Sequence, residues 1–133
     1  MSDEKQQEVF AWMKKADDDL RSARIIMDAK PPLIETALFH CQQAAEKAMK
    51  AFLTAHDMPF RKTHDLDELA AACEKIDVSL KEVLDPARDL TVFAWEFRYP
   101  GDSSTPSEAE SYDAISLAEA VILAMRQRLT GKE

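Results

Sequence analysis

Apolar residues recur every three or four positions along most of the chain, which is the spacing of one face of an α-helix. The first such segment runs from about Lys5 to Ala29, and the second from about Leu33 to Ala55. Pro31 and Pro32 separate them, because proline lacks the backbone amide and clashes with the preceding turn. The apolar face of the first segment consists of Val9, Trp12, Ala16, Leu20, Ala23 and Met27. The pattern therefore predicts two long amphipathic helices.

Capping residues predict where the next helices begin. Asp65 and Glu68 can form a capping box for a short third helix that ends near Lys75. Asp85 precedes Pro86, and this pair favours a helix from Pro86 to about Arg98. Asp is a common N-cap, and proline is tolerated at the first helical position.

A last helix is predicted from the capping box of Ser107 and Glu110 to about Leu129. Amphipathic helices without strands bury their apolar faces most economically as an antiparallel bundle. We therefore predict an all-α fold, with one domain over residues 1–133. It is an up-and-down four-helix bundle with an additional short helix. Surplus apolar residues outside the main seams also predict a homodimer. They are Phe93, Phe97, Leu117, Val121 and Leu123.

Composition and charge exclude several classes of function. Lys and Arg number 17 against 25 Asp and Glu, a net charge of −8, which argues against duplex DNA as a ligand. The only glycines are Gly101 and Gly131, so the chain has no glycine-rich phosphate loop. Two cysteines and three histidines lack the spacing of a zinc motif, and we expect no metal and no cofactor. The polar N-terminus and the absence of a long apolar run predict a cytoplasmic protein without a membrane span.

The segment from His40 to His64 carries a local charge of +2, from four basic and two acidic residues. A groove with that charge could hold phosphate. The alternative is a solvated helix face on which Glu46 and Lys50 pair one turn apart, and such exposed pairs are common.

Two further residues each have a functional and a structural interpretation. His64 precedes a predicted helix start, where it could bind phosphate or transfer a proton. It could instead belong to a capping turn formed by Asp65. Arg98 falls on the apolar line of its helix, where an unpaired charge is costly, so it could clamp a ligand phosphate or form an internal salt bridge. The acids considered for that bridge are Glu46, Asp65 and Asp102.

The chain resembles the HEPN domain family in the segment HCQQAAEKAMKAFL from His40 to Leu53. The resemblance continues through Thr63-His64-Asp65-Leu66 and Arg98-Tyr99-Pro100, and it covers nearly the whole chain. It implies an all-α bundle that is usually dimeric and is often encoded beside a small nucleotidyltransferase, in toxin–antitoxin-like arrangements. The resemblance also implies nucleotide binding in some members. In others it implies a metal-independent ribonuclease that uses an Arg followed, after four to six residues, by a His.

The ribonuclease motif is absent, because no histidine occurs beyond His64. We therefore predict no enzyme but a binding subunit for a nucleotide, a nucleotidyltransferase partner, or both. The alternatives are a ribonuclease with Arg98 and His64 in the reaction, and a purely structural partner subunit. The predicted nucleotide- or phosphate-binding residues are Gln43, Lys47, Lys50, His64, Arg98 and Tyr99. The predicted pairing residues are Glu46 and Asp65.

Overall fold

The computed structural model describes residues 1–94 and 106–130, and within these ranges it contains helices and no strand. The all-α prediction is confirmed. The elements are α1 (Asp3–Asp28), α2 (Ile34–Ala55), α3 (Leu66–Ile76), the 3₁₀-helix η1 (Val78–Leu80), α4 (Lys81–Ala87), the 3₁₀-helix η2 (Arg88–Ala94) and α5 (Glu108–Thr130).

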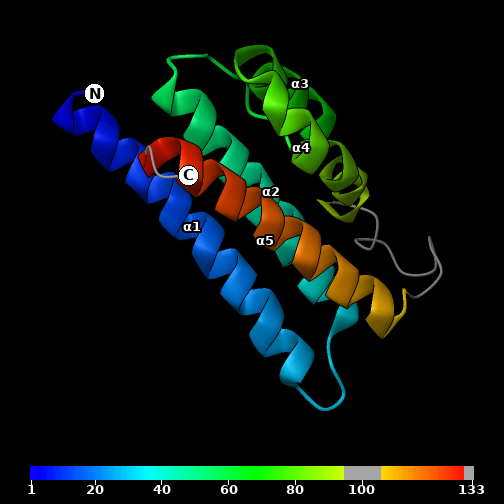
Figure 1. Ribbon diagram of the computed structural model, residues 1–133. Helices are drawn as coiled ribbons and strands as arrows, with labels where there is room; N and C mark the ends of the chain where they lie inside the picture. The colour runs from blue at the N-terminus through cyan, green and yellow to red at the C-terminus, as the bar shows by residue number, and fades with distance from the viewer. Residues whose placement is uncertain (95–105, 131–133) are drawn as a thin grey trace.

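Four helical segments of the bundle alternate in direction (Figure 1). Helix α2 is antiparallel to α1. The segment formed by α4 and η2 is antiparallel to α2, and α5 is antiparallel to that segment. The short helix α3 is the additional element, between α2 and α4 in the chain. The predicted up-and-down four-helix bundle is confirmed. Its third segment, α4 with η2, is shorter than α1, α2 and α5.

Helix α2 lies at the centre of the bundle and contacts α1, α3, η2 and α5. Its alanines allow these neighbours to approach closely, and its larger side chains fill the core. Phe52, Leu38 and Met49 are among the largest fully buried side chains of the described part of the chain. Because neighbours surround α2, its polar face is covered too. Polar side chains of α2, among them Gln43, Glu46 and Lys50, therefore lie inside the protein.

The predicted helix start at Asp85 and Pro86 is wrong. Helix α4 already begins at Lys81, and Pro86 lies inside it. The Asp85 carboxylate accepts hydrogen bonds from Lys81 Nζ at 2.9 Å and from Arg88 Nε at 3.0 Å, so it joins two basic side chains instead of capping backbone amides. Proline removes one amide from the helical ladder, and the chain tightens into η2 directly afterwards. The predicted continuation over residues 95–98 lies outside the described residues.

Two other caps form where the sequence indicates. The Glu110 amide donates to Ser107 Oγ at 3.2 Å, and the Ser107 amide donates to Glu110 Oε1 at 3.4 Å, as a capping box requires. Asp65 caps α3 by accepting from the Asp67 amide at 2.9 Å. Glu68 does not complete that box, because it accepts from Arg61 at 2.8 Å.

Both cysteines are buried free thiols in the core. Burial raises the pKa of the Cys41 thiol, and likewise that of Cys73, to about 12. Such thiols remain protonated and pack as small apolar groups.

Candidate functional site

Three of the predicted site residues, Gln43, Lys50 and His64, gather around the buried carboxylate of Glu46. Its Oε2 accepts from Lys50 Nζ at 2.9 Å, and its Oε1 lies 2.8 Å from His64 Nδ1. Gln42 Nε2 donates to the same Oε1 at 3.1 Å and to the backbone oxygen of His64 at 2.9 Å. Gln43 Nε2 donates to Gln42 Oε1 at 2.7 Å. The cluster therefore joins α2 to the loop before α3.

The electrostatics of this cluster favour an ionised Glu46. Burial alone raises the pKa of this carboxyl, but hydrogen bonds from Lys50, His64 and Gln42 outweigh burial and hold the pKa below its ordinary value of 4.5. Glu46 is therefore a structural anion whose charge Lys50 balances.

Lys50 is enclosed by aromatic rings as well as by its carboxylate. Its Nζ lies 5.6 Å from the ring centroid of Trp12 on α1 and 5.8 Å from that of Phe60 in the loop. The two rings meet edge to face, with centroids 6.2 Å apart. These contacts stabilise the ammonium group and leave Lys50 only 7% exposed.

A second carboxylate, Asp19 on α1, holds the other lysine. Lys47 Nζ lies 2.5 Å from Asp19 Oδ2, and His40 Nδ1 lies 2.8 Å from Asp19 Oδ1. The site prediction omitted Asp19 and His40. The signal for Asp19 was present, since it follows Trp12 by seven residues and Ala16 by three and so falls on the apolar face of its helix.

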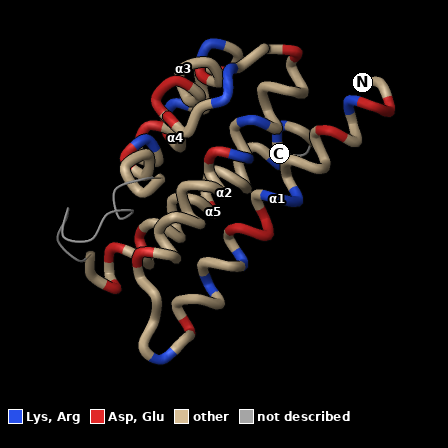
Figure 2. The backbone as a smooth tube through the Cα atoms, turned by 180° about the vertical axis from the view of Figure 1, so that it is seen from behind, with Lys and Arg blue, Asp and Glu red and all other residues tan. Residues whose placement is uncertain are grey.

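The predicted local excess of positive charge is therefore absent at these lysines. Lys47 and Lys50 are each paired with a carboxylate, and one of the two acids comes from a different helix, so counting charges along one segment could not detect it. Figure 2 shows that acidic and basic positions are also interspersed along α1. The alternative interpretation, a Glu46–Lys50 pair one turn apart, matches the structure except that the pair is buried and not solvated.

His64 combines a fixed orientation with access to solvent. Its side chain is 51% exposed, while its Nδ1 is held by the buried Glu46 carboxylate. A half-exposed imidazole oriented by a carboxylate can take up or deliver a proton.

The amides at the start of α3 are less available to an anion than the sequence suggests. The Leu66 amide donates to Thr91 Oγ1 at 2.9 Å, and the Asp67 amide donates to Asp65. Thr63 Oγ1 accepts from the Asp65 amide at 3.0 Å. Thr91 lies on η2, and nothing in the sequence pattern assigned it this contact.

Arg98 and Tyr99 lie outside the described residues, so the predicted phosphate clamp stays a prediction. Within residues 1–94 and 106–130, no group of three or more His, Cys, Asp or Glu side chains is placed to hold a metal ion. No buried side-chain nitrogen or oxygen in these ranges lacks a hydrogen-bond partner. None of the described helices is long and apolar enough to span a bilayer.

The chain matches the model of a known protein family. The sequence profile of the HEPN domain matches residues 9–128, which is nearly the whole chain. No curated protein and no solved structure matches the chain significantly. The matched range contains both carboxylate clusters, the whole of α2, α3 and α4, and most of α1 and α5.

Proposed function

Because the chain belongs to the HEPN domain family, we propose that it is a non-catalytic binding subunit whose ligand is a protein, a nucleotidyltransferase, and not a free nucleotide. The observation that carries this choice is the state of Lys47 and Lys50. The two lysines expected to hold phosphate each already hold a carboxylate.

The energetics support this choice. A phosphate that takes the place of Glu46 at Lys50 leaves a buried carboxylate without its cation, and breaking such a buried pair costs about 3–5 kcal/mol. That loss is comparable to the whole binding free energy of a millimolar ligand, about 4 kcal/mol. A nucleotide would therefore need most of its affinity from other residues.

A protein partner does not need a free cation in this cluster. The net charge of −8 favours a partner with a basic face, because complementary charge speeds association and selects the partner. The pairing with a nucleotidyltransferase, in a toxin–antitoxin-like module, is supported by the family resemblance.

Calorimetry and co-purification test the proposal together. Titration of the protein with ATP and GTP should give no saturable heat at millimolar concentration. Co-expression with a nucleotidyltransferase encoded beside the gene should give one complex on a sizing column. Saturable nucleotide heat that disappears in Lys47→Ala would overturn the exclusion of nucleotides, and failure to co-elute would overturn the choice of partner.

The orientation of His64 by Glu46 favours one other candidate, a ribonuclease in which this imidazole transfers the proton. Incubation of labelled RNA with the purified protein tests it. His56 provides a matched control, since it is exposed and packs on Phe52 with ring centroids 4.4 Å apart. Cleavage that is lost in His64→Ala and retained in His56→Ala would establish the ribonuclease and replace our proposal.

A further inference from the structure

The negative charge of the protein is concentrated on the part of the chain that forms α3, η1, α4 and η2. Residues 65–94 contain eight acidic and three basic side chains, a net charge of −5 out of the −8 of the whole chain. Helix α1, with seven acidic and five basic side chains over residues 3–28, lies on the other side of α2 and α5 (Figure 1). The negative potential of the protein is therefore directed mainly to one side of the bundle.

A groove of about 630 Å³ lies on this acidic side, along η1 and α4. It is lined by Val78, Ser79, Lys81, Glu82, Asp85 and Pro86. Val78 is 77% exposed, the highest fraction among the large apolar side chains of the described residues. The groove therefore offers an apolar contact within a mainly acidic surface.

Val78 is held in this exposed position by hydrogen bonds to both of its neighbours. The Ser79 amide donates to Asp77 Oδ1 at 3.0 Å. Arg128 on α5 donates to Asp77 Oδ2 at 2.9 Å and to Ser79 Oγ at 3.0 Å. Because the segment is already ordered, a partner that covers Val78 loses little free energy in fixing it.

Two carboxylates on this side are free to pair with a partner. Asp85 is not one of them, since it pairs with Lys81 at 2.9 Å and with Arg88 at 3.0 Å. Glu82 and Asp89 are exposed, and neither has an ion-pair partner within residues 1–94 and 106–130. Free carboxylates favour a partner with basic side chains, because complementary charge speeds association and disfavours acidic surfaces.

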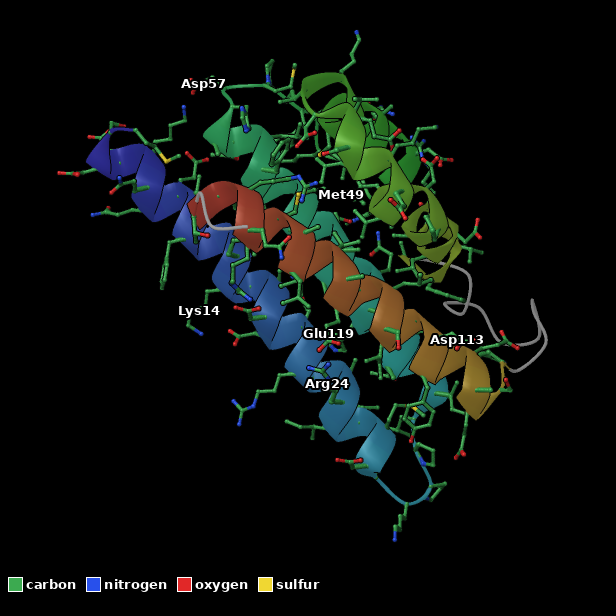
Figure 3. All side chains as sticks on the ribbon, in the orientation of Figure 1. Lys14, Arg24, Met49, Asp57, Asp113 and Glu119 are labelled. Atoms are coloured by element: carbon green, nitrogen blue, oxygen red, sulfur yellow. The ribbon has the colours of Figure 1, made fainter. Side chains whose placement is uncertain are left out.

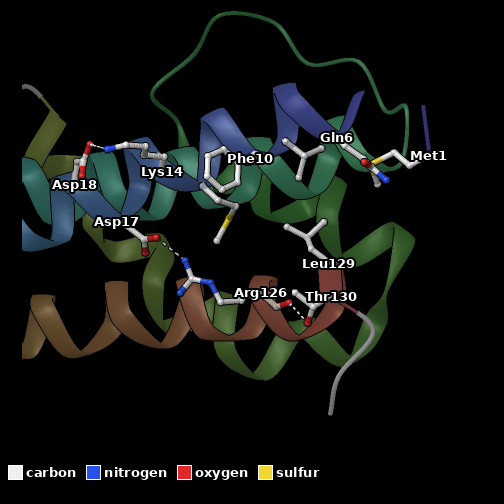
Figure 4. A pocket seen from close by; sticks show the side chains of 11 residues that line it. Met1, Gln6, Phe10, Lys14, Asp17, Asp18, Arg126, Leu129 and Thr130 are labelled. Atoms are coloured by element: carbon white, nitrogen blue, oxygen red, sulfur yellow. Dashed lines mark hydrogen bonds and ion pairs between the residues drawn. The ribbon is translucent and has the colours of Figure 1, made fainter. Parts of the chain in front are cut away.

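A larger groove, of about 690 Å³ between α1 and α5, lacks this selectivity. Its acidic and basic side chains pair with one another, Lys14 with Asp18 and Arg126 with Asp17 (Figure 4). The side-chain charges of that groove therefore do not favour a partner of one sign.

We propose that the groove along η1 and α4 binds a segment of a partner protein in which lysine or arginine side chains surround one apolar side chain. The apolar side chain contacts Val78 and Pro86, and the basic side chains pair with Glu82 and with Asp89, which follows Pro86 by three residues. This inference rests on the proposed function for the existence of a protein partner, and it names the surface at which that partner binds.

A short labelled peptide with a central leucine between lysines tests the groove by fluorescence anisotropy. The unmodified protein should bind the peptide at low ionic strength and release it as salt screens the charges. Glu82→Lys should weaken binding about fivefold or more, because it replaces an attraction by a repulsion. Val78→Ser should weaken binding about fivefold, because the apolar contact is lost.

Asp28→Lys is the matched control for the change of charge. Asp28 is an exposed acid at the end of α1, on the other side of the bundle from the groove. This variant should bind the peptide as the unmodified protein does. A peptide with glutamate in place of lysine should not bind, and circular dichroism should show that all three variants are folded.

Three results would overturn the proposal. They are the absence of salt-sensitive binding to the unmodified protein, binding that neither Glu82→Lys nor Val78→Ser weakens, and equal weakening by Glu82→Lys and Asp28→Lys. Peptide binding that follows the expected pattern while no nucleotidyltransferase co-elutes supports this groove and contradicts the proposed function alone. Co-elution of a nucleotidyltransferase without any peptide binding supports the proposed function and overturns this groove.

Discussion

At Glu46, one carboxylate satisfies donors from Gln42, Lys50 and His64. A charge this deeply buried is tolerated because each oxygen is hydrogen-bonded and an opposite charge lies beside it. The same residue connects α2 to the loop before α3. A change in one side chain should therefore affect both the stability of the core and the position of His64.

Glu46→Gln should destabilise the fold by about 3 kcal/mol, because it leaves the Lys50 ammonium buried without an opposite charge. Urea denaturation measures this loss. The double variant Glu46→Gln with Lys50→Met is the control, since removing both charges should restore most of the lost stability. A single variant that is as stable as the unmodified protein would contradict the structural importance of the pair.

The pH dependence of stability should also depend on Glu46. The pKa of this carboxyl is lower in the folded protein than its ordinary value of 4.5, so protons bind more readily to the unfolded chain. The stabilisation by Glu46 is then complete above that value and is lost as the pH falls through the folded pKa. The difference in unfolding free energy between the unmodified protein and Glu46→Gln should shrink between about pH 5 and pH 3. Parallel pH profiles for the two proteins would contradict this assignment.

At the scale of the element, α2 ends in a motif that uses a residue with positive φ. Asp57 has φ of 56°, the Met58 amide donates to the Leu53 oxygen at 2.9 Å, and the Asp57 amide donates to the Thr54 oxygen at 3.2 Å. This is the bond pattern of a Schellman motif, whose left-handed position is usually glycine. Asp57 also pairs with Lys5 at 2.7 Å, but its side chain is largely exposed, and such pairs contribute little.

Asp57→Gly should raise the free energy of unfolding by about 0.5–1 kcal/mol, because glycine adopts the left-handed conformation without a steric penalty. Thermal denaturation measures the change. Asp57→Asn is the control, since asparagine tolerates the same conformation but removes the charge that pairs with Lys5. A loss of stability in both variants would show that the ion pair contributes more than the backbone conformation.

At the scale of the whole molecule, α5 closes the bundle through its arginines and acids. Arg24 on α1 and Glu119 on α5 point toward each other and form an ion pair (Figure 3). Near its C-terminal end, α5 is attached to the junction of α3 and α4. Arg128 donates there to Asp77 Oδ2 at 2.9 Å and to Ser79 Oγ at 3.0 Å.

Arg128→Ala should lower the free energy of unfolding by about 1–2 kcal/mol, because charge-assisted hydrogen bonds to a partly exposed arginine are lost. Guanidinium denaturation measures the loss. Arg61→Ala is the control, since Arg61 pairs with Glu68 but is 72% exposed, and its removal should change stability by less than about 1 kcal/mol. Equal losses in the two variants would show that Arg128 does not hold the bundle closed.

The boundaries of α1, α2 and α5 follow from the spacing of apolar residues, from the prolines at 31 and 32 and from the capping box at Ser107. The Asp85–Pro86 signal misplaces the start of α4, because Asp85 pairs with Lys81 four residues earlier and with Arg88 three residues later instead of capping the helix. Within the candidate site, Glu46, Lys50 and His64 were selected from the sequence and lie together. Asp19 and Thr91 were not selected for it, since their contacts join elements that are far apart in the chain.

The amino-acid sequence by itself determined the helical class, the family and most of the helix ends, because periodicity and caps are local properties of the chain. Only the tertiary structure decided what the polar residues of α2 do. A periodic pattern shows which face of a helix is apolar, but not how many neighbours cover the opposite face. With α1 and the loop before α3 packed over that face, its lysines face carboxylates in the interior and not a ligand in solvent.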